Sequence, residues 1–453
     1  MAVLLAAASA VALASGAPGH GPAPRPIPIE RRDTLRVAEA VRPPPSGRSP
    51  TDSLQLMALL EDLAARNPMI RVAEAASRAA RARIGPLTRL PDPQLQIATM
   101  NRDLPGLGLN EPLGMNQVQL MQMVPIAGKI GLASAAARAQ ASAASIRVAE
   151  VGWEQRVRAA GLFYALYRTD HALVILRETR ELLRQLAGVA EAMYRVGEGR
   201  QADVLRAQVE IARMEEEIVR MESVRTSQAA QLNALRDRPA TEPVPPPTLP
   251  PGLDVTLPSA DSLVALGLTA RPALQAGAQD IVAATALERR AGREIWPDLQ
   301  LGMIYGQRGM TEGTERMLSL MVGASVPIWA GRRQKQLRLE AGAMREMAEA
   351  DLAGIQAETR GRVTELDAEI GRARRLLALY RTTVIPQATA TVTSATAAYR
   401  VGSVDFMTVL DNQMTVNRYR LELLVLEAEL GSAIAGLEMY TGHGWVLPAI
   451  ALP

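Results

Sequence analysis

Few residues in this sequence have the types and spacing that enzymatic or metal chemistry requires. The 453-residue chain has no Cys, which excludes disulfides, thiolate metal ligands and Cys nucleophiles. Its three His (His20, His171 and His443) are far apart, which argues against a His-based metal cluster. Gly128-Lys129 lacks the upstream Gly and the following Ser or Thr of a phosphate-binding loop, and no Gly-x-Ser-x-Gly sequence occurs. We therefore expect no enzymatic activity, no resident metal and no cofactor.

Methionine thioethers are the remaining candidates for metal binding. Met100, Met115, Met121 and Met123 lie close together in the sequence, and thioether ligands suit Cu(I). Methionine is also a common filler of apolar space, and the chain has 19 of them. Packing explains the cluster better than metal binding, so we predict no metal site there.

Composition predicts a helical body built from small side chains. Hydrophobic residues make up 48% of the chain and aromatic residues only 3%, which favours Ala- and Leu-rich helices over a deep globular core. The 50 Lys and Arg nearly balance the 47 Asp and Glu, so we predict no nucleic-acid partner. After the N-terminus, no apolar run reaches the roughly 18 residues that a membrane-spanning helix needs.

The N-terminus has the pattern of a secretory signal. Residues 2–14 are small and apolar, and Gly and Pro follow them. We predict a signal peptide over 1–16 and a Pro-rich linker over 17–52. No Lys or Arg precedes Arg25, so the usual positive start is missing. The alternative is an apolar terminus that frays.

The strongest pattern is an internal repeat at a spacing of about 205 residues. Tyr194–Gly197 recurs as Tyr399–Gly402, both reading Tyr-Arg-Val-Gly, and Val-Pro-Ile occurs once in each half. Pro91-Asp92 likewise recurs as Pro297-Asp298, and Asn67-Pro68 has a counterpart in Arg271-Pro272. The predicted divisions are repeat 1 over 53–240, a Pro-rich linker over 241–258, repeat 2 over 259–442 and a C-terminal tail over 443–453.

Each repeat follows the same plan. A helix of roughly 35 residues precedes a Pro-bounded segment, then a very long helix, a turn and a returning helix. At 1.5 Å per residue, the long helix would extend about 100 Å. The predicted helices are 53–86, 128–193 and 202–238 in repeat 1 and 259–295, 332–398 and 404–440 in repeat 2.

The Pro-bounded segments alternate with a period of two, which is typical of strands. We predict strand pairs over about 92–124 and about 298–326, each strand having the length of a tilted strand that crosses a bilayer. Trp296 and Trp329 fall at one end of the second hairpin and could anchor it at a membrane interface. An ordinary soluble hairpin is the alternative.

Four such strands cannot span a membrane alone, because lipid cannot satisfy the backbone groups of the two open edges. Several copies must therefore complete one barrel. One face of the second hairpin is small and polar and would line the lumen of that barrel, through Gly302, Gly306, Ser319, Gly323 and Ser325.

From about residue 53 to 442 the sequence resembles the TolC family of outer-membrane efflux channels. The resemblance rests on the repeated plan, on Val-Pro-Ile followed by Gly-Lys or Gly-Arg, and on the Tyr-Arg-Val-Gly turns. It implies a mainly α fold with a transmembrane β part. Four strands per chain would form a 12-stranded barrel in a homotrimer, continued by a long periplasmic α-helical barrel. The stretches 91–93, 101–105 and 122–129 look most like the heavy-metal-efflux branch.

The family resemblance also implies a role for the turns after each long helix, about 194–203 and about 399–411. Asp203 and Asp411 match acidic residues that ring the narrow periplasmic end of the pore, where they would attract cations. The alternative is that both carboxylates are solvated, or favoured by the dipole of the helix start. The other tip residues are Arg200 and Asp405 as ion pairs, Tyr194, Arg195, Tyr399 and Arg400 as adaptor contacts, and Gly197 and Gly402 as positions of positive φ.

These features together predict a passive exit duct in the outer membrane. The expected partners are outer-membrane lipid, a periplasmic adaptor of the membrane fusion protein type and an inner-membrane RND-type pump. The expected cargo is heavy-metal cations or drugs. Two alternatives stay open: a soluble periplasmic coiled-coil adaptor or scaffold, and a TolC-like exit duct of type I protein secretion.

Overall fold

The computed structural model describes residues 53–100, 115–250, 253–310 and 313–446, all of which lie in one compact unit, Pro50–Pro453. The predicted signal peptide, the whole N-terminal linker, the stretch 101–105 and most of the C-terminal tail lie outside the described residues.

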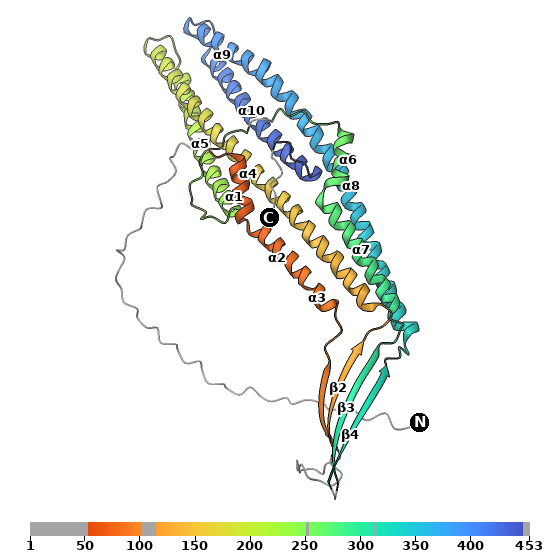
Figure 1. Cartoon of the computed structure of the whole chain (residues 1–453). Helices are drawn as coiled ribbons and strands as arrows, with labels where there is room; N and C mark the ends of the chain where they lie inside the picture. Colours follow the sequence, from red (N-terminus) through yellow and green to blue (C-terminus); the bar gives the residue numbers. More distant parts are fainter. Residues whose placement is uncertain (1–52, 101–114, 251–252, 311–312, 447–453) are drawn as a thin grey trace, which may run out of the picture. The chain divides into compact units, whose positions relative to one another are not determined.

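Repeat 1 begins with three short helices, α1 (Leu56–Arg66), α2 (Pro68–Ala82) and α3 (Ile84–Leu87). Strands β1 (Gln94–Met100) and β2 (Met115–Val124) follow. The 67-residue helix α4 (Lys129–Arg195) is about 100 Å long at 1.5 Å per residue. After the tip turn, α5 (Gln201–Leu235) returns beside α4 (Figure 1).

Repeat 2 has the same order of elements. Helices α6 (Ala260–Ala270) and α7 (Pro272–Arg293) precede strands β3 (Leu299–Met310) and β4 (Gly313–Ala324). The second long helix is continuous but contains two π-helical turns: η1 (Ala330–Gln334), α8 (Lys335–Leu379), η2 (Tyr380–Val384) and α9 (Ile385–Arg400). Helix α10 (Phe406–Thr441) returns beside α9 and α8.

Two details of the helices differ from the sequence prediction, and proline explains both. The single helices expected over 53–86 and 259–295 are interrupted before Pro68 and Pro272. The residues that precede them, Asn67 and Arg271, have ψ of 124°, because proline disfavours helical geometry in the residue before it. In the second long helix, η2 ends just before Pro386, which cannot donate an intrahelical hydrogen bond.

The four strands form one antiparallel sheet in the order β1-β2-β3-β4, as the repeat plan predicted. Strand β2 of repeat 1 pairs with β3 of repeat 2, with Val118 opposite Tyr305 and Leu120 opposite Met303. The two hairpins therefore join edge to edge within one chain. Strands β1 and β4 are the edges of this described sheet.

The helices pack around α4 and α8. Helix α7 lies between them and contacts both, whereas α2 contacts α4 (Figure 1). Helix α10 likewise contacts α4, which ties repeat 2 to repeat 1. No described helix combines the length and the low polarity that crossing a membrane requires. The confirmed fold is therefore mostly helical, with one small antiparallel sheet.

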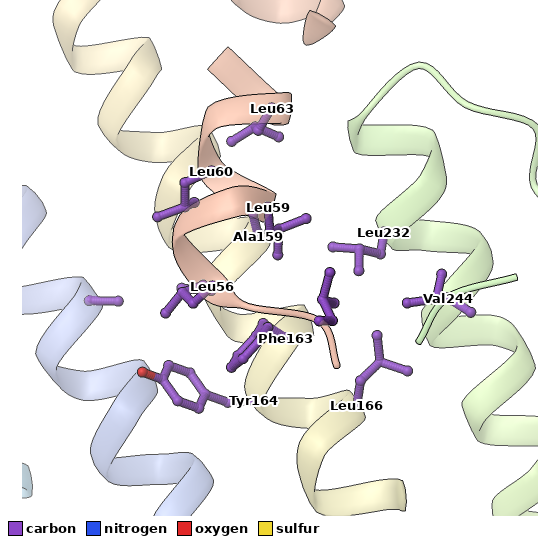
Figure 2. Packing of buried hydrophobic residues seen from close by; sticks show 14 of the residues in the cluster. Leu56, Leu59, Leu60, Leu63, Ala159, Phe163, Tyr164, Leu166, Leu232 and Val244 are labelled. Atoms are coloured by element: carbon purple, nitrogen blue, oxygen red, sulfur yellow. The ribbon is translucent and has the colours of Figure 1, made fainter. Parts of the chain in front are cut away.

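The core of repeat 1 lies where α1 packs against α4 (Figure 2). Four leucines of α1 are at most 2% exposed, and each contributes about 1.5–3 kcal/mol by burial. The ring of Tyr164 on α4 packs directly over Gly431 of α10, where any side chain would collide with it. The principal side chains of this cluster are Leu56, Leu59, Leu60, Leu63, Phe163, Tyr164, Leu166, Leu232 and Val244.

Candidate functional site

One face of the sheet is apolar and exposed across all four strands. The register places Leu95, Leu120, Met303 and Leu320 in one row across the sheet. All four are exposed, Leu320 by 81%. Soluble proteins rarely leave so continuous an apolar surface open to water. The neighbouring rows add Ile97, Val118, Tyr305 and Leu318, and then Leu301 and Val322, which are also exposed.

The opposite face carries glycines and polar side chains together with Ile304 and several methionines. One of its rows contains Gln96, Gln119, Ile304 and Ser319. Gly302, Gly306 and Gly323 lie on this same face, as the alternation of the second hairpin predicted. Repeat 1 contributes Gln96, Gln117 and Gln119 to this face. The sheet thus has two chemically different faces, which suits a wall between lipid and an aqueous lumen.

Methionines fill the space above the glycines of this polar face. Met121 and Met321 lie over Gly302, and Met115 and Met317 lie over Gly306. Each glycine therefore provides room for a thioether from a neighbouring strand. Among the described residues, no group of three or more His, Cys, Asp and Glu is placed to hold a metal ion.

The two Trp predicted as anchors lie at the same end of the second hairpin. Trp296 precedes β3 and is 50% exposed, and Trp329 precedes η1 and is 65% exposed. Beside them, Lys129 is buried and its Nζ lies 2.8 Å from Oδ1 of Asp298. Nζ also donates to the carbonyl oxygen of Trp296 at 2.9 Å, and it lies 3.4 Å from Oε2 of Glu294. Two repeated sequence motifs, Gly-Lys and Pro-Asp, therefore meet where the strands join the helices.

The two tip turns have the same backbone geometry. Gly197 and Gly402 have φ of 82° and 75°, the left-handed conformation that was predicted for them. The amide of Gly199 donates to Met193 O at 3.0 Å, and that of Ser403 donates to Ala398 O at 3.0 Å. In both turns a hydrogen bond from beyond the glycine closes the end of the long helix.

The carboxylates of the tip occupy different environments. Asp405 is the N-cap of α10: its Oδ1 accepts hydrogen bonds from the amide and the hydroxyl of Thr408. The hydroxyl and amide of Thr408 lower the pKa of Asp405, and the charge of Arg200 acts in the same direction. Asp203 lies half-buried in the first turn of α5, and Asp411 lies exposed on α10. Arg200 and Asp405 form no ion pair within 4.0 Å among the described contacts.

The two helical hairpins pack against each other just behind their tips. Tyr399 is only 7% exposed, and its ring lies 5.8 Å from that of Phe406. Burial raises the pKa of Tyr399, and the nearby Asp203 carboxylate adds to the rise. Tyr399 packs with Phe406, Val409 and Ala207 in one buried apolar cluster that spans both hairpins. Tyr194, Arg195 and Arg400 are exposed, and Arg195 donates to Glu191 at 2.6 Å.

A buried ion pair joins the two repeats, and no sequence pattern indicated it. Arg271 donates from Nε and Nη2 to Oε1 of Glu150, and from Nη1 to the hydroxyl of Thr359. Oε2 of Glu150 accepts from the amide of Ala273 at 3.1 Å. Helices α4, α7 and α8 are thus tied together beside the break before Pro272. Only the Arg-Pro landmark was visible in the sequence.

Comparison with solved structures shows that the fold is shared with outer-membrane channels. The outer-membrane channel OprN matches with a TM-score of 0.73 at 18% identity, over 86% of this chain and 90% of its own. CusC matches with a TM-score of 0.75 at 17% identity, over 86% and 93%. The outer membrane protein VceC of Vibrio cholerae matches with a TM-score of 0.72 at 17% identity, over 86% and 96%.

Sequence comparison points in the same direction for repeat 2. A search of curated protein sequences finds no significant match. Residues 263–443 match the family described as "Outer membrane efflux protein". CusC is one of several similar channels, so these matches do not single out the heavy-metal branch. Repeat 2 therefore carries the sequence signature of the outer membrane efflux protein family, on a chain whose fold is that of outer-membrane channels.

Proposed function

We propose that this chain is one subunit of a passive exit duct in the outer membrane. The observation that carries the proposal is the sheet with an exposed apolar face and an opposite face on which Gly, Gln and Ser lie among methionines. Lipid would cover the first face and a water-filled lumen would contact the second. Three copies would supply the strands of one barrel, and the long helices would continue it into the periplasm.

The duct would perform no chemistry of its own. A periplasmic adaptor would hold its helical tips, and an inner-membrane pump of the RND type would supply energy and cargo, either heavy-metal cations or drugs. Of the tip residues predicted to contact the adaptor, Tyr194, Arg195, Gly197, Arg400 and Gly402 are exposed. A soluble scaffold would not need the apolar sheet face, which weighs against that alternative. A duct for type I protein secretion would share the same fold and differ in its pump.

The first test is whether the chain conducts. Purified protein reconstituted in planar bilayers should give stepwise ion currents, and the native protein should stay with membranes during osmotic shock. Release as a water-soluble protomer that never conducts would overturn the proposal. Conduction by the purified protein alone would show that the duct needs neither adaptor nor pump to pass ions.

We further propose that Asp203 and Asp411 form a cation-attracting constriction at the tip. Asp203→Asn combined with Asp411→Asn should raise the resting conductance and weaken block by trivalent cations. Glu191→Gln is the matched control, because Glu191 is an exposed carboxylate near the same tip that pairs with Arg195. Unchanged conductance and block in the double variant would remove the gate assignment and leave the fold as described.

A further inference from the structure

The chain passes from a strand pair into a long helix at two corresponding corners, one in each repeat. The first corner reads Val-Pro-Ile-Ala-Gly-Lys over residues 124–129, and the second reads Val-Pro-Ile-Trp-Ala-Gly-Arg over residues 326–332, between β4 and α8 (Figure 1). The second corner therefore has one extra residue, Trp329. The π-helical turn η1 begins directly after Trp329 and accommodates the extra length, because a π-helical turn spans one more residue than an α-helical turn.

The cations of the two corners have different surroundings. Lys129 of the first corner is buried and lies 2.8 Å from Asp298 and 3.4 Å from Glu294. Arg332, its counterpart in the second corner, is exposed, and so is the following Arg333. Neither arginine takes part in an ion pair within the part of the chain that the structure describes. Both corners carry a cation, but only the second corner exposes it.

Positive charge is concentrated around the second corner. The segments 289–298 and 326–335 lie beside each other because β3 and β4 form a hairpin. They contain six Lys and Arg but only two Asp and Glu, whereas the whole chain is nearly balanced. The two acids are Glu294 and Asp298, and Lys129 already binds both. The six cations are Arg289, Arg290, Arg293, Arg332, Arg333 and Lys335.

An exposed apolar surface leads to the same corner. Leu320 and Val322 of β4 belong to the apolar face of the sheet. Beyond the strand, Val326 and Ile328 continue this surface with exposures of 73% and 75%, and Trp329 ends it. A chain that leaves lipid through the headgroup layer has this order: apolar side chains, then an aromatic ring, then cations.

One helical turn brings the Trp329 ring and the two arginines together. The amides of Arg332 and Arg333 both donate to Trp329 O, at 3.0 and 2.9 Å. Residues three and four positions apart lie on the same side of a helical turn. Two guanidinium groups therefore follow one indole ring on one side of the chain. Guanidinium groups suit phosphate because they can donate two parallel hydrogen bonds to its oxygens.

We propose that Arg332 and Arg333 bind the phosphate of an anionic phospholipid in the periplasmic leaflet of the membrane, beside the Trp329 ring. The apolar side chains before them contact the acyl chains, and the cations at the end of α7 attract further anionic headgroups. The assignment deepens the proposed duct and rests on it. It goes beyond general contact with lipid, because it predicts a preference for anionic over zwitterionic headgroups.

Quenching of Trp fluorescence tests this preference. The natural protein in phosphatidylcholine vesicles is mixed with brominated phosphatidylglycerol or with brominated phosphatidylcholine, whose bromine atoms quench nearby indole rings. Each arginine should favour phosphatidylglycerol by about fivefold, the effect of one cation near an anionic surface. Arg332→Gln combined with Arg333→Gln should lose most of the preference. Equal binding of the two lipids by the natural protein would overturn the proposal.

Arg360→Gln combined with Arg375→Gln is the matched control. Both residues are exposed arginines of α8, farther from the sheet, and neither has an ion pair among the described residues. This variant loses the same charge and should keep the natural lipid preference. A similar loss in the control would show that the total charge of the protein selects the lipid, and would overturn the assignment to this corner.

Two further measurements distinguish the lipid from other occupants. Sodium phosphate should weaken the preference no more than sodium chloride does at equal ionic strength. Stronger displacement by phosphate would identify free phosphate as the ligand and overturn the lipid assignment. In lipid-free detergent, the Arg332→Gln and Arg333→Gln double variant should form as many multimers as the natural protein. Fewer multimers would assign the arginines to a contact between copies instead.

The outcomes separate the lipid surface from the duct. Natural protein that conducts but binds both lipids equally would refute the lipid surface while the duct stands. Protein that prefers phosphatidylglycerol but never conducts would support the lipid surface and refute the duct.

Discussion

Arg271 and Glu150 are joined by two hydrogen bonds of 3.2 and 3.1 Å in the interior of the helical body. Both side chains are buried, and the guanidinium also lies 4.4 Å above the centre of the Tyr440 ring. The pair ties the start of α7 to α4 at the break before Pro272. An ion pair so placed leaves a costly charge behind when one partner is removed.

Glu150→Ala should therefore destabilise the chain by about 3–5 kcal/mol, because the Arg271 cation stays buried without its carboxylate. Thr359→Val is the milder control, since it removes only one hydrogen bond to the same guanidinium, worth about 1.5–3 kcal/mol. Thermal unfolding in detergent would measure both. Equal melting temperatures for Glu150→Ala and the natural sequence would contradict the importance of the pair.

We also expect Glu150 to make the stability of the fold depend on pH. Burial raises the pKa of Glu150 above its ordinary value of 4.5, although Arg271 opposes the rise. The folded state then holds the proton more tightly than the unfolded state, so stability from this group falls as pH rises above 4.5. The melting temperature of the natural sequence minus that of Glu150→Gln, measured at a series of pH values, should fall as pH rises. A difference that rises with pH would contradict it.

The two faces of the sheet can be tested with neighbouring residues of β4. Leu320→Arg places a charge on the exposed apolar face, which near the middle of a bilayer costs about 2–4 kcal/mol. Ser319→Arg places the same charge on the opposite face, towards Ile304 and Gln119. We expect the first variant to lose membrane insertion, and the second to insert but conduct less. The yield of heat-resistant multimers would measure insertion, and bilayer currents would measure conduction. Equal insertion of the two variants would refute the assignment of one face to lipid and the other to the lumen.

Gly431 is predicted to be the most demanding helical glycine for packing. A Cβ there would collide with the ring of Tyr164, which is buried and cannot move aside. Gly431→Ala should therefore cost about 1–3 kcal/mol by overpacking. Gly436→Ala on the same helix is the control, because its Cβ would meet only the flexible methyl groups of Leu366 at 3.3 Å. Chemical unfolding of both variants would compare them, and equal stabilities would show that the ring can shift.

Periodicity and internal repetition were sufficient to predict the long helices and the four strands. The long helix predicted over 128–193 spans Lys129–Arg195, since a sustained helical pattern and a glycine at each end define it. The helix breaks were harder to predict. Pro68 and Pro272 were recognised as repeat landmarks, but the local effect of proline on Asn67 and Arg271 was not applied to the helices around them.

Contacts between the repeats could not be predicted from one sequence. Glu150 and Arg271 are far apart in the chain, and nothing in their local patterns pairs them. The burial of Tyr399 has the same origin: its motif is identical to that of Tyr194, but only the second turn is covered by the neighbouring hairpin. Sequence repetition predicts equivalent backbones, whereas tertiary contacts decide which copy of a residue is exposed.

The cap at Asp405 gives the tip its own pH dependence. Hydrogen bonds from the Thr408 hydroxyl and amide hold the pKa of Asp405 below its ordinary value, so the unfolded tip binds protons more readily than the folded one. The cap's contribution is therefore present above the ordinary pKa of 3.8 and is lost as pH falls through the lower folded value. Asp405→Ala should increase hydrogen exchange of the first turn of α10 at neutral pH, whereas Asp405→Asn should preserve protection because asparagine also caps helices. Unchanged exchange in Asp405→Ala would mean that packing of Phe406 alone holds the turn.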